Sequence, residues 1–153
     1  MSGSDGYIGW ASRISRMPYG TAVYVKMPGA REISPSKPKR DRVDMTHCES
    51  PGMFPESRPG FFSDTEVTFK MTAIDSIADP VNAAIQEALF TLRGTGQVET
   101  WKIEWYSNAT VPVLLRTETF TAWLDSCDPG TISPKEAQTI DVTLAVTGLP
   151  VRT

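Results

Sequence analysis

The chain has little of the material from which most catalytic and metal sites are built. Its 153 residues include one histidine and two cysteines. A structural zinc site needs four ligands at characteristic spacing, and neither a CxxC nor an HxxxH pair is present. The one candidate cluster is His47–Cys48–Glu49. Successive side chains on a strand point to opposite faces, so this trio cannot converge on one ion while the strand continues. We therefore predict no catalytic, metal or cofactor site, and interpret His47 as the end of a strand.

A basic surplus and long apolar runs are also missing. The net charge is −3, which argues against a nucleic-acid-binding surface. No apolar run is long enough to span a bilayer, and the first residues lack the charged lead and apolar stretch of a signal peptide. The sequence RGTGQ at 93–97 lacks the spacing and the lysine of a phosphate-binding loop. We expect a protein kept in a reducing cytosol, with Cys48 and Cys127 as free thiols, although spacing alone leaves a disulfide between them open.

Alternation of apolar and polar residues is the strongest pattern that is present. It predicts six strands, at 21–27, 41–47, 65–74, 98–106, 113–124 and 137–148. Between the third and the fourth, Asp79 fits a helix N-cap and Pro80 the first helical position. An apolar stripe from Val81 to Leu92 predicts a helix over about 80–92. These elements favour a mainly β fold, an antiparallel β-sandwich or half-open barrel with one flanking helix.

The predicted domain organisation is simple. We expect an N-terminal arm at 1–20, one β domain at 21–148 and a short C-terminal tail at 149–153. Within the domain, the stretches 28–41 and 125–136 are rich in turn residues and are predicted to be loops. The basic run at 37–40, KPKR, is interpreted as solvated loop.

A long loop, at about 48–63, stands out by its composition. Its three prolines exclude a central strand, since each removes a ladder donor. It also carries large apolar groups that a monomer gains little by exposing. Loops of this length are usually functional, so we predict an assembly loop that contacts another protein surface. Its candidate contact residues are Met53, Phe54, Arg58, Phe61 and Phe62.

Four carboxylates are predicted at polar-face positions of strands. They are Glu66, Glu99, Glu118 and Asp141. The simpler interpretation is a solvated face. The alternative is that this face lines a channel or another surface.

The run RVDMTHCESPGMFPESRPGFFSDTEVTFKM, at 42–71, resembles a hallmark of phage tail tube proteins, the major tail proteins of long-tailed phages. In that family a strand ending in Val-x-x-Thr enters a Pro/Gly loop, which returns through a glycine and an acidic turn. Val43, Thr46, Gly60 and Asp64 match these features. The run FTAWLDSCDPGTISPKEAQTIDVTLAVTG, at 120–148, is similar to the closing strand, loop and strand of the family. The resemblance spans roughly residues 20–148.

The resemblance implies a self-assembling structural protein of the virion tail, built in the host cytoplasm. Hexameric rings would stack into a hollow tube, whose continuous inner β-barrel passes DNA without binding it specifically. The long loop and the chain ends would join successive rings, and the four carboxylates become candidates for lumen-facing residues. The implied partners are copies of the chain itself and tape-measure, tail-tip and terminator proteins, with no membrane partner, cofactor or enzymatic activity.

Two alternatives remain open from the sequence. One is a tail terminator or the inner-tube protein of a contractile injection machine, which share related folds. The other is a cytosolic hydrolase that uses Cys48 or Cys127. That activity would require a thiol with a lowered pKa in a convergent pocket, and the sequence indicates neither.

Overall fold

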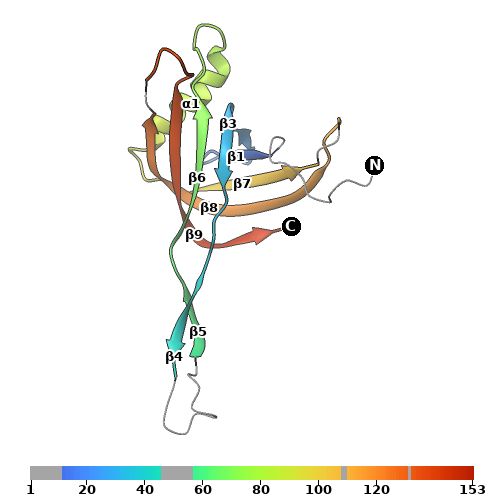
Figure 1. Ribbon diagram of the computed structural model, residues 1–153, viewed down its shortest axis with the longest axis vertical. Coiled ribbons are helices and arrows are strands. Elements are labelled where there is room, and N and C mark those ends of the chain that lie inside the picture. The colour runs from blue at the N-terminus through green and yellow to red at the C-terminus, as the bar shows by residue number, and fades with distance from the viewer. Residues whose placement is uncertain (1–11, 46–56, 108–109, 131) are drawn as a thin grey trace.

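A computed structural model describes residues 12–45, 57–107, 110–130 and 132–153. Seven strands form one antiparallel sheet in the order β2-β1-β7-β8-β9-β6-β3, and the other two form a separate ribbon, β4–β5 (Figure 1). The helix lies against the sheet at the end of the molecule opposite the ribbon. The elements are β1 (Arg13–Met17), β2 (Val25–Lys26), β3 (Ala30–Ser34), β4 (Arg40–Asp44), β5 (Ser57–Phe62), β6 (Thr65–Thr72), α1 (Pro80–Leu92), β7 (Glu99–Tyr106), β8 (Leu114–Pro129) and β9 (Thr139–Arg152).

The sheet is curled into a half-open barrel, which confirms the predicted fold class. Its two outermost strands, β2 and β3, are consecutive in the chain and are joined only by residues 27–29. A connection this short forces the two sheet edges toward each other. Gly29 makes the turn with φ of 71°, and a Cβ at this position would lie 2.9 Å from the carbonyl oxygen of Thr72. Only glycine meets both conditions without strain.

Two long strands, β8 and β9, continue from one half of the curled sheet into the other. β7 pairs with β8 no further than Glu99 opposite Ala122, and β6 pairs with β9 no further than Thr65 opposite Val146. The β8–β9 register shifts twice along the way, once on each side of Ala122. Such bulges bend a strand and let it pass from one half of a sheet to the other.

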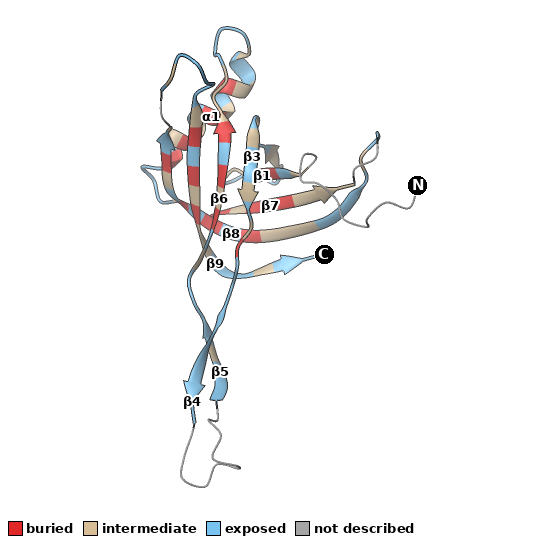
Figure 2. Cartoon of the chain, viewed as in Figure 1, coloured by how far each residue is buried: buried red, intermediate tan, exposed pale blue. Residues whose placement is uncertain are grey.

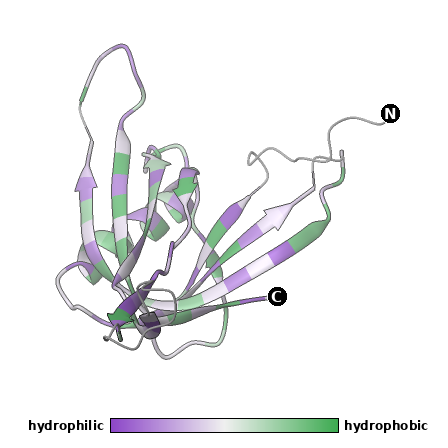
Figure 3. Cartoon of the chain, turned by 60° about the horizontal axis from the view of Figure 1, so that its bottom comes forward, coloured by the Kyte–Doolittle hydropathy of each residue, from purple (hydrophilic) through white to green (hydrophobic). Residues whose placement is uncertain are grey.

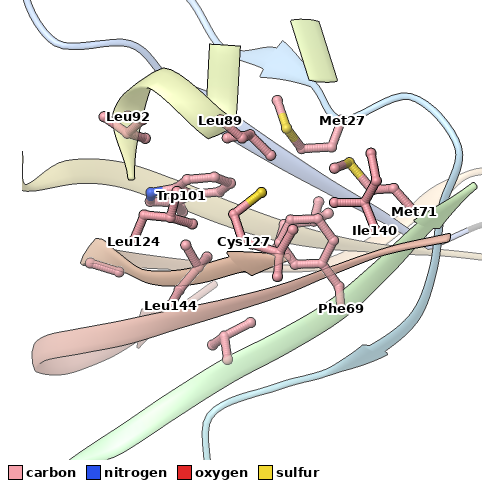
Figure 4. Close-up of a cluster of buried hydrophobic side chains, with 14 of the residues drawn as sticks. Met27, Phe69, Met71, Leu89, Leu92, Trp101, Leu124, Cys127, Ile140 and Leu144 are labelled. Carbon is pink, nitrogen blue, oxygen red and sulfur yellow. The ribbon is translucent and has the colours of Figure 1, made fainter. Parts of the chain in front are cut away.

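The hydrophobic core lies between the curled sheet and α1. Figure 4 shows Trp101, Phe69, Leu89 and Cys127 gathered there, and the Trp101 and Phe69 ring centroids are 6.3 Å apart. The predicted apolar face of 98–106 is confirmed, because Trp101 and Ile103 are buried. Hydropathy bands alternate along the strands in Figure 3, as expected for a sheet with one buried face.

The helix begins and ends as predicted, with Asp79 accepting a hydrogen bond from the backbone N–H of Asn82. Its buried face is rotated from the predicted stripe, however. Val81 is 71% exposed, whereas Gln86 is only 2% exposed. The Gln86 amide accepts a bond from the N–H of Ile74 and donates to the carbonyls of Pro28 and Thr72. The prediction failed because backbone groups at the ends of β2 and β6 need buried partners, and a glutamine supplies both donor and acceptor.

Several predicted loops contain strands. The segment 28–41 includes β3, the long loop 48–63 includes β5, and β8 continues to Pro129 inside the predicted loop 125–136. Conversely, the strand predicted at 21–27 shrinks to the two residues of β2. Pro59 is tolerated in β5 because a two-stranded ribbon has two open edges. These segments become strands through partners distant in sequence, which local patterns do not reveal.

Strands extend into both segments that were predicted to flank the β domain. β1 lies inside the segment 1–20 that was assigned to an arm, and pairs with β7 along its whole length. β9 continues past residue 148 to Arg152, inside the predicted tail. The division into arm, domain and tail stays a prediction.

Candidate assembly surfaces

The β4–β5 ribbon projects away from the body and buries nothing of its own. Every described residue of the two strands is exposed except Gly60, which is half-buried (Figure 2). Phe61 is 90% exposed. The Arg40 guanidinium stacks over the Phe62 ring at 4.1 Å and donates a hydrogen bond to the carbonyl of Gly60. The ribbon therefore exposes aromatic and cationic side chains on its surface.

A shallow hollow of about 520 Å³ lies on this ribbon. It is lined by Arg40, Asp41, Val43, Pro59, Gly60 and Phe61. Of the predicted contact residues, Arg58, Phe61 and Phe62 lie on the ribbon. Met53 and Phe54 lie outside the described residues. The role of all five in assembly stays a prediction.

Several strand edges of the curled sheet have no strand partner among the described residues, and the outer edge of β3 and part of β8 are two of them. β3 pairs with β6 on one side and with no described strand on the other. β8 extends beyond β7 from Trp123 to Pro129, and on this side the Arg93 side chain donates to the carbonyl of Cys127. Exposed strand edges of this kind are templates for pairing with another chain.

Two of the four predicted carboxylates share the exposed polar face of the sheet. Glu66 of β6 lies opposite Ala145 of β9, and Lys70 of β6 lies opposite Asp141 of β9. Glu66 and Lys70 are four residues apart on one strand, so all of these side chains lie on the same face. Both carboxylates are exposed. A groove of about 860 Å³ crosses this face, and its lining includes Glu66, Thr68, Trp123, Asp125 and Thr147.

The other two carboxylates lie on the core side, so their predicted polar-face placement is wrong. Glu99 is opposite Ala122, and Glu118 is opposite Ile103, both of which are buried. Period-two counting could have found this, because Glu99 is two residues before Trp101 and Glu118 is two before Phe120.

Glu99 has a structural partner instead of a channel-facing position. Its carboxylate accepts from the Arg16 guanidinium at 2.9 Å and from the backbone N–H of Tyr19 at 2.6 Å. The ion pair is almost fully buried, with side-chain exposures of 1% for Glu99 and 13% for Arg16. It ties β1 and the turn that follows to β7. Glu118 accepts a weaker bond, at 3.1 Å, from the hydroxyl of the buried Ser36.

A third surface was not predicted from the sequence. The turn after β7, the start of β8 and the end of β9 form a wing that extends past the core (Figure 1). Its exposed apolar residues are Val111, Val113, Leu114, Leu115, Leu149 and Val151. Leu114 and Leu115 are adjacent apolar residues, which interrupt the alternation of apolar and polar residues expected of a strand with one buried face. This interruption is the sequence signal that could have predicted the exposed apolar wing.

The chemistry expected of a hydrolase is not supported at Cys127. This cysteine is a free thiol, fully buried in the core. Burial is the main cause that raises its pKa to about 11, so the thiol stays protonated and unreactive at neutral pH. Within the part of the chain that the structure describes, no group of three His, Cys, Asp or Glu side chains could hold a metal. His47, Cys48 and Glu49 lie outside the described residues.

At the sequence level, no protein-family model and no curated protein matches the chain. The fold, by contrast, matches solved structures over nearly the whole chain. A chain of the anti-feeding prophage baseplate, in a structure described as 6-fold symmetrised, aligns with a TM-score of 0.75 at 9% identity, covering 99% of this chain and 97% of that one. A chain of the PVC sheath-tube complex, from an extracellular contractile injection system, gives 0.72 at 13% identity, covering 98% and 93%. The SPP1 tail tube gives 0.70 at 12% identity, covering 97% and 79%.

The chain has the tail-tube fold. This agrees with the family that the runs at 42–71 and 120–148 resemble. No helix in the described ranges is long and apolar enough to cross a membrane.

Proposed function

We propose that this protein is a structural subunit that assembles into hexameric rings, and that these rings stack into a hollow tail tube through which DNA passes. The observation that carries the proposal is a curled sheet with unpaired strand edges in a chain of tail-tube fold. The protein would reside in the virion tail, after assembly in the host cytoplasm. Tape-measure, tail-tip and terminator proteins would be its further partners.

Ring closure would use two of the free strand edges of the sheet. The β3 edge of one copy and the Trp123–Pro129 edge of the next copy each offer unpaired backbone groups. Pairing them would satisfy those groups and join the sheets into one continuous inner barrel. The 6-fold symmetry of the anti-feeding prophage structure supports six copies in a ring.

The lumen would be lined by the exposed polar face of β6, β8 and β9. This face carries the carboxylates of Glu66, Asp125 and Asp141, and the ammonium of Lys70. A surface without a basic surplus does not retain phosphates, because like charges repel and no counterions are displaced. DNA would then move through the bore without adhering to the wall.

A second candidate is the inner tube of a contractile injection machine. The match to the PVC sheath-tube complex favours it. A tail terminator is the third possibility within this fold. The three differ in assembly: a tube protein polymerises without limit, a terminator stops at one ring, and an inner tube also binds a sheath on its outer surface.

Negative-stain electron microscopy of the purified protein tests the proposal. We expect hollow tubes of variable length at high protein concentration. Isolated rings that never stack would identify a terminator. A protein that stays monomeric at every concentration and ionic strength would contradict the tube proposal altogether.

The lumen assignment has its own test. Glu66→Lys and Asp141→Lys should leave tube formation unchanged and slow DNA ejection, because each added cation is repeated six times around the bore. Glu87→Lys, on the exposed side of α1, makes the same charge change away from this face and serves as the control. Normal ejection from tubes of both lumen variants would show that another face lines the channel.

A further inference from the structure

The free edge of β8 is covered at one point by a side chain from the end of α1. Arg93 directly follows the helix, and its side chain reaches β8 beyond Ala122, the last residue of that strand that pairs with β7. The Arg93 Nη1 donates to the carbonyl oxygen of Cys127 at 2.7 Å and to the Asp128 carboxylate at 3.3 Å. The first bond is short and charge-assisted, so it is the stronger of the two.

The Cys127 carbonyl is one of the backbone groups that a neighbouring strand would need. Along an antiparallel strand, the backbone groups of successive residues point to opposite sides. The N–H of Gly130 donates to the carbonyl of Thr139 in the same register, so Cys127, three residues earlier, directs its backbone groups away from β9. Arg93 therefore occupies an acceptor on the side of β8 that lies open beyond β7.

The contact can open without disturbing the helix. The Arg93 side chain is 46% exposed and its Asp128 partner 66% exposed, so the ion pair between them contributes little to stability. The backbone N–H of Arg93 bonds to the carbonyl of Leu89, and this bond ends the helix whatever the side chain does. The guanidinium also lies over the Phe90 ring, at 5.6 Å, which leaves it a place on α1 when it leaves the strand.

The β3 edge, which would pair with β8 of another copy, is short and irregular. β3 has five residues, and its register against β6 shifts between Arg31 and Ser34. Within the shift, Glu32 has a φ of 52°, which is in the left-handed region that favours glycine. Bulges and charged groups are devices by which sheet edges avoid pairing. Because β3 offers few regular backbone groups, each acceptor on β8 counts.

We propose that Arg93 is a removable cap on the β8 edge, and that it leaves the Cys127 carbonyl when β3 of another copy pairs there. In the free subunit the cap satisfies an acceptor that would otherwise be open to any strand, which disfavours association. On ring closure a backbone N–H of the neighbouring copy replaces the guanidinium. This inference rests on the proposed ring closure and adds an autoinhibitory contact to it.

Removal of the donor tests the cap. Arg93→Met keeps an apolar stem of similar length and cannot donate a hydrogen bond. We expect its critical concentration for tube formation to fall about tenfold, because assembly no longer breaks a bond of typical strength. The melting temperature of the monomer should stay within a few degrees of wild type, which shows that the variant is folded.

Three further variants separate the cap from a general effect of charge. Arg116→Met makes the same charge change on the part of β8 that pairs with β7, and should leave the critical concentration unchanged. Asp128→Asn removes the ion pair and keeps the bond to Cys127, so it should change the critical concentration by less than about twofold. Arg93→Lys retains a cationic donor and should behave nearly like wild type.

A peptide tests the cap without tube formation. The probe is a fluorescein-labelled peptide of residues 29–35, which includes β3, and fluorescence polarisation measures its binding to the monomer. We expect Arg93→Met to bind this peptide about tenfold more tightly than wild type or Arg116→Met. Cryo-electron microscopy of assembled tubes gives the direct observation: the Arg93 guanidinium should no longer contact the Cys127 carbonyl.

The outcomes separate this cap from the proposed function. Wild-type tubes together with an unchanged or higher critical concentration for Arg93→Met would overturn the cap and leave the tube function standing. Tubes in which Arg93 still contacts the Cys127 carbonyl would also overturn it. A wild-type protein that forms no tubes would contradict the proposed function, and the peptide would then decide the cap, since equal affinities for wild type and Arg93→Met would exclude it.

Discussion

The body of the molecule and the β4–β5 ribbon use the same kinds of residue in opposite ways. In the body, Phe69 and Trp101 are buried between the sheet and α1. In the ribbon, Phe61 and Phe62 lie on a two-stranded element with no buried residue among those described. An isolated two-stranded hairpin is at best marginally stable in water. The ribbon is held because residues 35–39 connect β3 to β4 and residues 63–64 connect β5 to β6. Its aromatic residues contribute little to folding.

The largest difference between the two regions should appear on truncating one aromatic residue in each. Trp101→Ala would leave a cavity in the core and lower the free energy of unfolding by about 3–5 kcal/mol. Phe61→Ala should change it by less than about 0.5 kcal/mol, because that ring is already in solvent. Chemical denaturation measures both. Similar losses from the two variants would show that the ribbon helps to hold the body together.

The buried ion pair should have the next largest effect. Glu99→Ala leaves the Arg16 guanidinium and the Tyr19 N–H without their acceptor, at a cost of about 3 kcal/mol. The double variant Arg16→Met, Glu99→Leu removes both charges and should recover most of that loss. Asp141→Ala, an exposed carboxylate, is the control. A single variant as stable as the control would mean that this ion pair does not secure β1.

Cys127 should make the body sensitive to alkaline pH. Its folded pKa is raised to about 11, whereas the unfolded thiol titrates lower, near 9. As the pH rises, the thiol of the unfolded chain therefore loses its proton before the thiol of the folded chain does. The contribution of the buried thiol to the free energy of unfolding is fully present below about pH 9 and is lost as the pH rises to about 11. The loss is on the order of 2 kcal/mol. Cys127→Ala should show a correspondingly shallower decline over this range, as measured by denaturation at several pH values. Equal slopes for the two proteins would contradict the assignment.

Deleting residues 50–61 should have the smallest effect on stability and the clearest effect on assembly. The deletion removes most of β5 and leaves all seven strands of the main sheet. The melting temperature of the monomer should hold within a few degrees, whereas stacking should be lost. Long tubes formed by the deletion variant would mean that the ribbon has no part in joining rings.

Much of the body could be predicted from local sequence. Alternation from Ile140 to Val146 located the last strand, and Asp79 with Pro80 located the start of the helix. These signals work because a strand with one buried face and a capped helix each impose a short-range pattern. The exposure of Phe61 and Phe62 on the ribbon was also predicted, from their place among prolines and glycines; their role in assembly stays a prediction.

The predictions from sequence were wrong at positions where contacts with residues distant in the chain determine the structure. Gln86 lies outside the predicted apolar stripe, and it is buried because its amide pairs with backbone groups at the ends of β2 and β6. Glu99 was assigned to a solvated face, and Arg16, which lies 83 residues earlier in the chain, pairs with it in the core. β3 was assigned to a loop and is a strand because β6 lies beside it.

The sequence by itself determined the mainly β class, the helix at 80–92 and the position of the long segment that carries the exposed aromatic residues. These depend on periodicity and on capping, which act over a few residues. Only the tertiary structure decided the curl of the sheet and its free strand edges. The curl depends on the short link between β2 and β3, which become the two outer strands only when the whole sheet has formed.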